Sequence, residues 1–246
     1  MTFSGDEIER YARHLVLAEV GGPGQQRLKA ARVAVVGLGG VGGPATLYLA
    51  AAGLGALRLI DDDAVALSNL QRQVAFTTAD IGRSKVEAGA AAVAALNPHV
   101  RIEPVAKRLT SQNAARLIAG CDVVIDGTDD FAARFAVNAA CVAARVPLVS
   151  GALGRWSGQV GVFTGRPCYR CLVPAAPPEA DTCARVGVIG ALAGVVGSMA
   201  ALEAVKLITG AGEALIARLL IYDGLAGAAR TVAVGADPDC PTCAQH

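Results

Sequence analysis

The sequence is poor in charged residues, which make up 17% of its 246 residues, whereas hydrophobic residues make up 53%. Chains with this balance pack rather than stay disordered, and this length is enough to bury a substantial core. The net charge of only +1 gives no electrostatic reason to expect nucleic acid or an anionic membrane surface as a partner. We therefore expect a packed domain, no nucleic-acid partner and no membrane partner.

The N-terminus, MTFSGDEIER, lacks the apolar run of a secretory signal. The chain nevertheless contains seven cysteines. In a reducing cytoplasm, paired cysteines serve metal binding or chemistry more often than disulfides. The sequence thus predicts a cytoplasmic protein.

The most membrane-like segment, 186–202, carries no charge and contains a Gly190-x-x-x-Gly194 pair, so a transmembrane helix is one interpretation. The run is slightly short for a span, four glycines dilute it, and Glu203 and Lys206 continue the same helix. We favour a buried helix that packs closely through its glycines.

Strand and helix patterns alternate along the first 150 residues. Buried-strand patterns occupy 32–36, 57–60, 100–105, 122–125 and 147–150, and helical patterns follow Gly42 and occupy 84–96, 111–119 and 131–144. Ahead of them we expect helices at 6–17 and 25–30, separated by a Gly-Gly-Pro turn. This alternation predicts an α/β fold, a Rossmann-type, mainly parallel sheet with helices on both faces.

After residue 151 the pattern changes. Strand-like runs at 158–163, 215–222 and 230–234 surround the glycine-rich helix, and a Pro-rich stretch at 173–183 is typical of a mobile surface loop. We expect these mixed or antiparallel strands to extend the sheet. The chain is then one domain with a nucleotide-binding half, 1–150, and a second half, 151–246.

A glycine motif follows the first strand and opens a helix. It consists of Gly37, Gly39, Gly40 and Gly42, and Asp61 ends the next strand. Glycines permit a tight turn and close approach of backbone N–H groups to phosphate, and the carboxylate can accept from ribose hydroxyls. The motif predicts a nucleotide site. Alone, it favours a nicotinamide or flavin oxidoreductase.

Basic and acidic residues follow this motif. Arg72 and Lys85 come after the second strand and suit a polyphosphate, whose charge must be neutralised for attack at phosphorus. Asp129 and Asp130 follow the fourth strand, where one could coordinate Mg²⁺ and the other cap the next helix. The sequence leaves their order open, and solvated surface charges are the alternative for Arg72 and Lys85.

Four cysteines form two C-x-x-C pairs, Cys168 with Cys171 and Cys240 with Cys243. Together they offer the four thiolates of a structural zinc site, although the long gap between the pairs requires the fold to bring them together. A redox C-x-x-C and two unrelated pairs are the alternatives.

Cys183 stands alone in the Pro-rich loop near Arg185 and a helix start, a setting that favours a nucleophilic thiolate. An incidental loop cysteine is an equal alternative. The three histidines are scattered, and no Ser-His-Asp or Walker-type pattern stands out.

Several of these motifs together resemble one family, the bacterial sulfur-carrier adenylyltransferases of molybdopterin and thiazole biosynthesis, relatives of ubiquitin-activating enzymes. The resemblance covers about residues 10–243. The motifs that carry it are Arg10-Tyr-Ala-Arg13, Gly37-Leu-Gly-Gly-Val-Gly42, Ser68-Asn-Leu-Gln-Arg-Gln73, Gly82-Arg-Ser-Lys85, Thr128-Asp129, Pro147-Leu-Val-Ser-Gly151 and Pro167-Cys-Tyr-Arg-Cys171.

The resemblance implies roles for individual residues. Asp61 holds the ribose of ATP, Arg72 and Lys85 hold its triphosphate, and Asn69 and Gln73 lie near the phosphates. Asp129 binds Mg²⁺. The remaining implied roles are a homodimer in which Arg13 reaches the partner's ATP site, a zinc site made by Cys168, Cys171, Cys240 and Cys243, and a sulfur-transfer link at Cys183.

The resemblance also implies the reaction. The enzyme adenylylates the C-terminal Gly-Gly carboxylate of a small ubiquitin-like sulfur-carrier protein, and its second half bears the zinc and binds that carrier. No rhodanese-like extension follows Cys243, so we expect a separate sulfur donor, a cysteine desulfurase or a rhodanese. The family usually has Asn where this chain has Asp130. A Rossmann-type NAD-binding oxidoreductase and a non-catalytic carrier-binding protein are the alternative functions.

Overall fold

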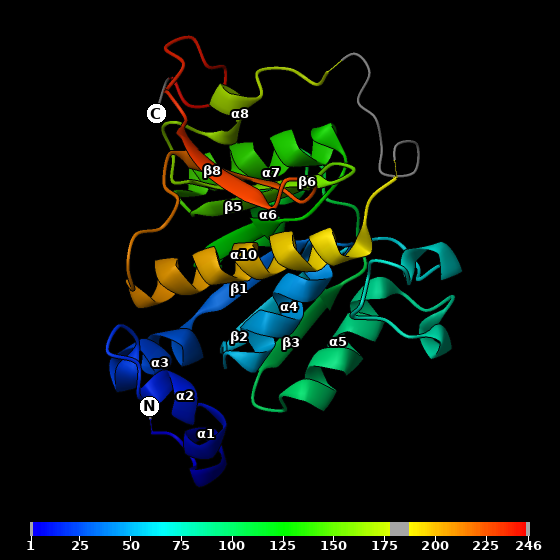
Figure 1. The fold of residues 1–246 in the computed structure, drawn as a ribbon, viewed down its shortest axis with the longest axis vertical. Coiled ribbons are helices and arrows are strands. Elements are labelled where there is room, and N and C mark those ends of the chain that lie inside the picture. The colour runs from blue at the N-terminus through cyan, green and yellow to red at the C-terminus, as the bar shows by residue number, and fades with distance from the viewer. Residues whose placement is uncertain (1, 178–186, 245–246) are drawn as a thin grey trace.

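One mixed sheet organises the chain in the computed structural model, which describes residues 2–177 and 187–244. Its strand order is β3-β2-β1-β4-β5-β6-β7-β8. The strands are β1 (Arg32–Val36), β2 (Ala56–Ile60), β3 (Arg101–Val105), β4 (Val123–Asp126), β5 (Leu148–Leu153), β6 (Ser157–Phe163), β7 (Arg218–Asp223) and β8 (Ala228–Ala233). The first five pair in parallel and the last three add antiparallel pairs, which confirms the predicted fold (Figure 1).

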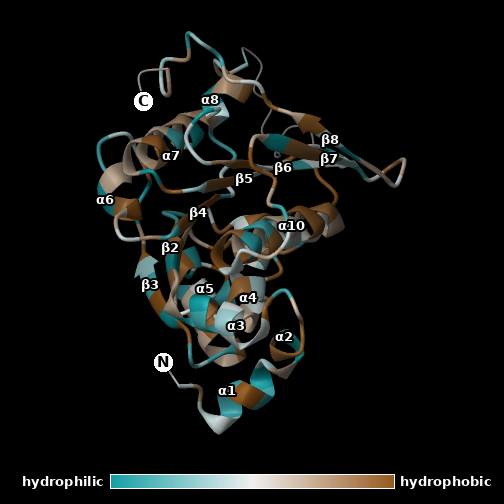
Figure 2. Ribbon diagram, turned by 90° about the vertical axis from the view of Figure 1, so that its left-hand side faces the viewer, coloured by the Kyte–Doolittle hydropathy of each residue, from teal (hydrophilic) through white to brown (hydrophobic). Residues whose placement is uncertain are grey.

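Helices cover both faces of the sheet (Figure 2). One face packs against α3 (Gly21–Ala30), α4 (Gly42–Ala51), α5 (Lys85–Leu96) and α10 (Gly190–Thr209). The other packs against α6 (Ala114–Ile118), α7 (Phe131–Ala144) and α8 (Tyr169–Leu172). The helices α1 (Gly5–Arg10) and α2 (Ala12–Leu15) lie near the N-terminus, and the 3₁₀ turns η1 (Leu67–Asn69) and η2 (Thr78–Asp80) precede α5.

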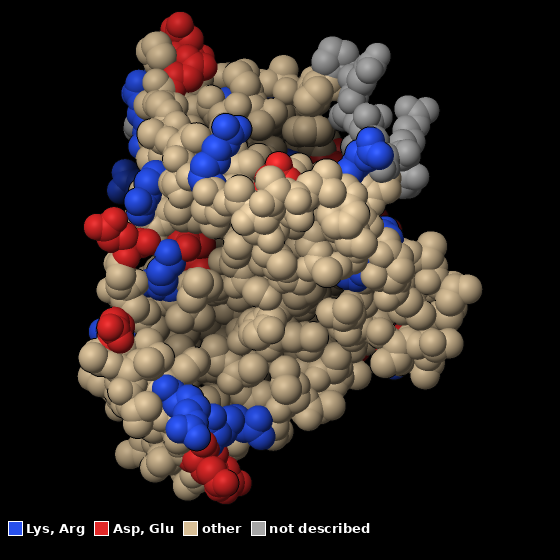
Figure 3. Space-filling view, in the orientation of Figure 1, with Lys and Arg blue, Asp and Glu red and all other residues tan. Residues whose placement is uncertain are grey.

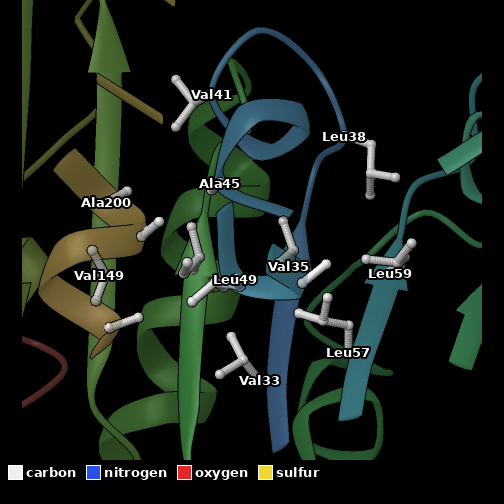
Figure 4. Packing of buried hydrophobic residues seen from close by; sticks show 14 of the residues in the cluster. Val33, Val35, Leu38, Val41, Ala45, Leu49, Leu57, Leu59, Val149 and Ala200 are labelled. Atoms are coloured by element: carbon white, nitrogen blue, oxygen red, sulfur yellow. The ribbon is translucent and has the colours of Figure 1, made fainter. Parts of the chain in front are cut away.

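The period-two geometry of strands builds these two layers. Val33 and Val35 of β1 belong to the cluster under α4 and α10, whereas Ala34 and Val36 belong to the cluster under α6 and α7. Figure 4 shows Val33 and Val35 of β1 beside Leu49 of α4, and Val149 of β5 beside Ala200 of α10. Since both faces of β1 and β4 are buried, these two central strands consist almost entirely of apolar residues.

The helix α10 is long and apolar enough to cross a membrane by length and composition alone. It packs instead against the sheet and α4, burying Val196, Gly197 and Ala200. A Cβ at Gly197 would lie 2.5 Å from the carbonyl oxygen of Val41, and one at Gly190 would lie 2.1 Å from that of Gln71. The structure thus agrees with a core helix packed through glycines, although Gly194 faces open space.

Several element boundaries differ from the sequence prediction; for example, α6 spans Ala114–Ile118 and not 111–119, and β7 spans Arg218–Asp223 and not 215–222. The Gly-Gly-Pro segment predicted as a turn forms the first turn of α3. Proline is tolerated at Pro23 because backbone N–H groups in the first turn have no acceptor within the helix, so the N–H that proline lacks is not missed. The predicted helix 6–17 divides at Tyr11, whose hydroxyl accepts a hydrogen bond from Asn97. The strand predicted to end at Ser150 continues to Leu153, since it pairs with β6.

Candidate functional site: a nucleotide cavity and a cysteine cluster

A cavity of about 400 Å³ opens at the carboxyl ends of β1, β2 and β4. The strand order reverses between β1 and β4, and ligands of open α/β sheets bind where it does so. The predicted site residues that line the cavity are Gly37, Gly39, Gly40, Asp61, Arg72, Gln73, Lys85 and Asp129. Residues far apart in the sequence thus meet at one edge of the sheet.

The glycine loop has two tasks. Gly37 has a φ of +81° and turns the chain away from β1. A Cβ at Gly42 would lie 1.8 Å from the carbonyl oxygen of Gly37, so Gly42 allows α4 to start directly against the loop and does not line the cavity. Gly39 and Gly40 do line it, so their backbone faces the space that a ligand would fill.

Asp61 is fixed to the glycine loop. One carboxylate oxygen accepts a hydrogen bond of 2.7 Å from the N–H of Leu38, and the other accepts one of 2.9 Å from the N–H of Asp63. Burial raises the pKa of Asp61, although nearby Lys85 and these backbone bonds oppose the shift. The anchored carboxylate keeps lone pairs free to accept further hydroxyl donors.

Lys85 begins α5 and is buried, with its ammonium 2.7 Å from a carboxylate oxygen of Asp63. The side chain of Asp63 is 66% exposed. Because one partner is in solvent, the pair is weak, and an anion entering the cavity can take the place of Asp63 beside the ammonium.

Two residues from the segment after β2 also face the cavity. Arg72 lines it while donating to the carbonyl of Ser68 at 3.1 Å. Gln73 is 4% exposed, and its side-chain oxygen has no hydrogen-bond partner; a buried orphan of this kind marks a position where a ligand or water is expected. Asn69 instead accepts from the N–H of Ala66 and does not line the cavity.

The structure decides which of the two adjacent aspartates caps α7. Asp130 accepts hydrogen bonds from the N–H groups of Ala132 and Ala133 at 3.1 and 3.3 Å, and Arg108 lies 3.5 Å from it. Asp129 is exposed at the cavity and is not the cap residue. Its carboxylate is thus the one available for a cation.

Sequence reasoning missed several residues of the cavity wall, among them Arg134 and Tyr169. Arg134 is the one charged residue of α7 and is buried, and this lone charge in an apolar helix was a usable signal. Burial disfavours its charge, but the ion pair with Asp126 together with interactions with Tyr169 and Asp129 outweighs burial and raises the pKa of Arg134. Tyr169 lies with its ring centroid 5.8 Å from that guanidinium.

The two C-x-x-C pairs meet in space. The sulfur atoms of Cys168 and Cys240 are 3.7 Å apart, those of Cys171 and Cys243 are 3.5 Å apart, and all four lie within 4.8 Å of one another. Four sulfurs at ~2.3 Å from a tetrahedral ion are about 3.8 Å apart. The cluster therefore has the dimensions of a tetrahedral metal site, and these four thiols form no disulfide.

The cluster favours one thiolate near neutral pH. Burial opposes ionisation of Cys240, but hydrogen bonds from the N–H groups of Cys243 and Thr242 outweigh it and lower the pKa of Cys240 to about 7. Burial raises the pKa of Cys168. Asn138 of α7 donates to the sulfur of Cys168 at 3.5 Å and accepts from the N–H of Tyr169, so α7 contacts the cluster directly.

Two predicted residues stand apart from this arrangement. Arg13 is exposed on α2 and is not part of the cavity lining among the described residues. Cys183 lies outside the described residues.

The sequence matches the ThiF family over residues 11–242. The chain belongs to the ThiF family. Among its relatives is the sulfur carrier protein adenylyltransferase of Thermus thermophilus, 44% identical over 99% of this chain and 93% of that protein. The molybdopterin-synthase adenylyltransferase of Escherichia coli is 44% identical over 98% of both chains.

A solved structure supports the fold of this ThiF-family chain. The crystal structure of Escherichia coli MccB with MccA-N7isoASN superposes with a TM-score of 0.86, covering 98% of this chain and 75% of the other. The two sequences are 22% identical, so this likeness concerns the fold alone.

Proposed function

We propose that this ThiF-family chain is an ATP-dependent adenylyltransferase that activates the C-terminal Gly-Gly carboxylate of a small ubiquitin-like sulfur-carrier protein. The observation that supports the proposal is one cavity that joins a glycine loop, an anchored carboxylate and cationic side chains that include Arg72 and Lys85. Relatives at 44% identity are named for this reaction. The product serves thiocarboxylate formation in molybdopterin or thiazole biosynthesis.

The nucleotide binds along the edge of the sheet. Asp61 accepts from the ribose hydroxyls, and the N–H groups of the glycine loop ahead of α4 face the phosphates. The ammonium of Lys85 exchanges its ion pair with Asp63 for one with the triphosphate. Arg72 and Gln73 lie beside the triphosphate. Asp129 would hold Mg²⁺, which when bound neutralises charge on the phosphates.

The reaction is an in-line displacement. An oxygen of the carrier's terminal carboxylate attacks the α-phosphorus of ATP, the bond from that phosphorus to the bridging oxygen breaks, and pyrophosphate leaves with the bridging electrons. Lys85 and Arg72 stabilise the negative charge that develops on the phosphate oxygens. The product is an acyl-adenylate that a sulfur nucleophile can attack.

Zinc is proposed as a structural metal of the cysteine cluster, because the sulfur spacing fits a tetrahedral ion. Zinc held by thiolates of both pairs would tie the segment around Cys240 to α8 and α7.

The active form is proposed to be a homodimer in which Arg13 reaches the partner's ATP site. A broad face over α10 and α4 carries almost no charge (Figure 3), and Tyr48 and Leu202 on these helices are 59% and 57% exposed. Large apolar side chains on an uncharged face are typical of an interface.

Sulfur delivery is proposed to depend on a separate donor, a cysteine desulfurase or a rhodanese, in the cytoplasm. Cys183 would act after adenylylation. Its replacement by alanine is then expected to spare pyrophosphate exchange.

The test is ATP–pyrophosphate exchange with a carrier ending in Gly-Gly. We expect Mg²⁺-dependent exchange that Lys85→Ala lowers by at least about tenfold, equivalent to ~1.4 kcal/mol of transition-state stabilisation. Exchange that persists with a carrier lacking its last two residues would contradict the substrate. Tight NAD binding in place of ATP would favour the oxidoreductase, and carrier binding without exchange would indicate a non-catalytic protein.

A further inference from the structure

Arg134 is a buried charge to which the proposed reaction gives no task. It stands in the first half of α7, is 5% exposed, and reaches the wall of the nucleotide cavity. A buried charge is unfavourable unless it is paired and its remaining protons are hydrogen-bonded. The partners of its guanidinium therefore indicate what the residue does.

Those partners lie on three consecutive parts of the cavity wall. Nη1 donates to a carboxylate oxygen of Asp126 at 3.1 Å and to the hydroxyl of Ser150 at 3.0 Å. Nη2 donates to the carbonyl of Gly151 at 2.8 Å and to that of Thr128. One planar group thus joins the end of β4, the loop that follows it and the middle of β5, a geometry suited to the planar guanidinium of arginine.

These bonds fix the residue that precedes Asp129. The N–H and hydroxyl of Thr128 donate to Asp126 at 3.0 and 2.7 Å, while its carbonyl accepts from Arg134. On the other side, Asp130 is fixed as the cap of α7. Asp129 is consequently held between two anchored neighbours, with its exposed carboxylate at the cavity.

The Nη protons of this guanidinium are not free to bind a substrate. An arginine has four Nη protons and one Nε proton, and four acceptors occupy the Nη groups: Asp126, Ser150, Gly151 and Thr128. The four Nη donors of Arg134 are therefore directed into the protein and not into the cavity.

We propose that Arg134 is a positioning residue of the nucleotide site, which holds the Thr128–Asp129 segment so that Asp129 can bind the Mg²⁺ of Mg·ATP. The proposal rests on the proposed function for the role of Asp129. It predicts that disrupting the hydrogen bonds of the Arg134 guanidinium weakens Mg²⁺-dependent nucleotide binding and leaves carrier recognition intact.

The test is Arg134→Lys, which keeps the positive charge but replaces the planar fork with one nitrogen. ATP binding is measured by calorimetry at several Mg²⁺ concentrations, without turnover. We expect the Mg²⁺ concentration needed for half-maximal binding to rise about tenfold, or ~1.4 kcal/mol, with zinc content unchanged and the KM for the carrier within about twofold. The matched control is Arg145→Lys, an exposed arginine at the end of the same helix, which should bind as the parent does.

Ser150→Ala is a milder variant for the case in which Arg134→Lys does not fold. It removes one hydroxyl that contacts both Arg134 and Asp126, and we expect a rise of about threefold in the Mg²⁺ requirement, within the usual range for one hydrogen bond. A folded Arg134→Lys or Ser150→Ala protein with unchanged Mg²⁺ dependence would overturn the proposal. A raised KM for the carrier with unchanged Mg²⁺ dependence would also overturn it, because that result would assign Arg134 to the substrate.

The binding measurement separates this proposal from the proposed function. If the parent protein shows no carrier-dependent exchange, the proposed function fails, yet the comparison of Mg·ATP binding in the parent and Arg134→Lys still decides the role of Arg134.

Discussion

At the scale of single residues, two adjacent aspartates of identical chemistry have different tasks. Both carboxylate oxygens of Asp130 accept hydrogen bonds from backbone N–H groups of α7, whereas Asp129 remains exposed at the cavity. The division follows from helix geometry, because the side chain directly before Phe131 is the one that can reach the N–H groups of the first turn. The family resemblance associates Asn with position 130, and Asn caps a helix equally well.

This division predicts different outcomes for two matched substitutions. Asp129→Asn should lower kcat/KM for exchange by at least about a hundredfold at low Mg²⁺. Asp130→Asn should change stability by less than about 0.5 kcal/mol, because the cap is retained. Exchange kinetics over a Mg²⁺ series and thermal unfolding of both variants provide the measurement. Equal losses of activity in both would contradict the assignment.

At the scale of elements, α10 shows how glycine sets the distance between helix and sheet. A Cβ at Gly197 would lie 2.5 Å from the carbonyl oxygen of Val41 and 2.9 Å from Pro44. A Cβ at Gly194, three residues earlier in the same helix, would meet nothing within 4 Å. The glycine loop and α4 are therefore supported from behind by a helix that only glycine allows to approach so closely.

The contrast between these glycines is directly testable. Gly194→Ala should raise the free energy of unfolding by up to about 1 kcal/mol, because alanine favours the helix. Gly197→Ala should instead lower it by about 1–3 kcal/mol, since overpacking outweighs the same gain. Denaturant unfolding of both variants measures the difference, and stabilisation by both would show that α10 can move away from α4.

At the scale of the whole molecule, the cysteine cluster joins parts of the chain that are distant in sequence. Cys168 and Cys240 are 72 positions apart and are both buried. If zinc occupies the cluster, Cys240→Ser should lower zinc content and thermal stability together, because metal binding at such sites is coupled to folding. Cys121→Ser, a buried thiol outside the cluster, should retain zinc. Elemental analysis finding no zinc in the parent protein would contradict this expectation.

The proposed homodimer makes a second prediction at this scale. Arg13→Ala and Lys85→Ala proteins should each be inactive, because each lacks one cation of a shared site. Mixed and allowed to exchange subunits, they should recover about a quarter of the parent activity, since half of the dimers are mixed and each has one intact site. Recovery is measured by exchange after mixing, with either variant alone as control. No recovery despite demonstrated subunit exchange would exclude a shared site.

The sequence by itself determined the parts of this protein that depend on local pattern. A continuous apolar run and a helical hydrophobic pattern predicted β1 and α7 at their observed bounds, and the glycine loop predicted a nucleotide site. These features are local because strand and helix periodicity act over a few residues. The turn expected at Gly21 to Pro23 failed for a similar reason, because these residues are also compatible with the first turn of a helix.

Only the tertiary structure decided which side chains of these elements contact one another. The choice between Asp129 and Asp130, the pairing of Lys85 with Asp63, and the approach of Cys168 to Cys240 all depend on contacts between atoms. The four acceptors of Arg134 come from two strands and a loop. No periodicity encodes such a set, because it exists only after parallel strands have brought their carboxyl ends to one edge of the sheet.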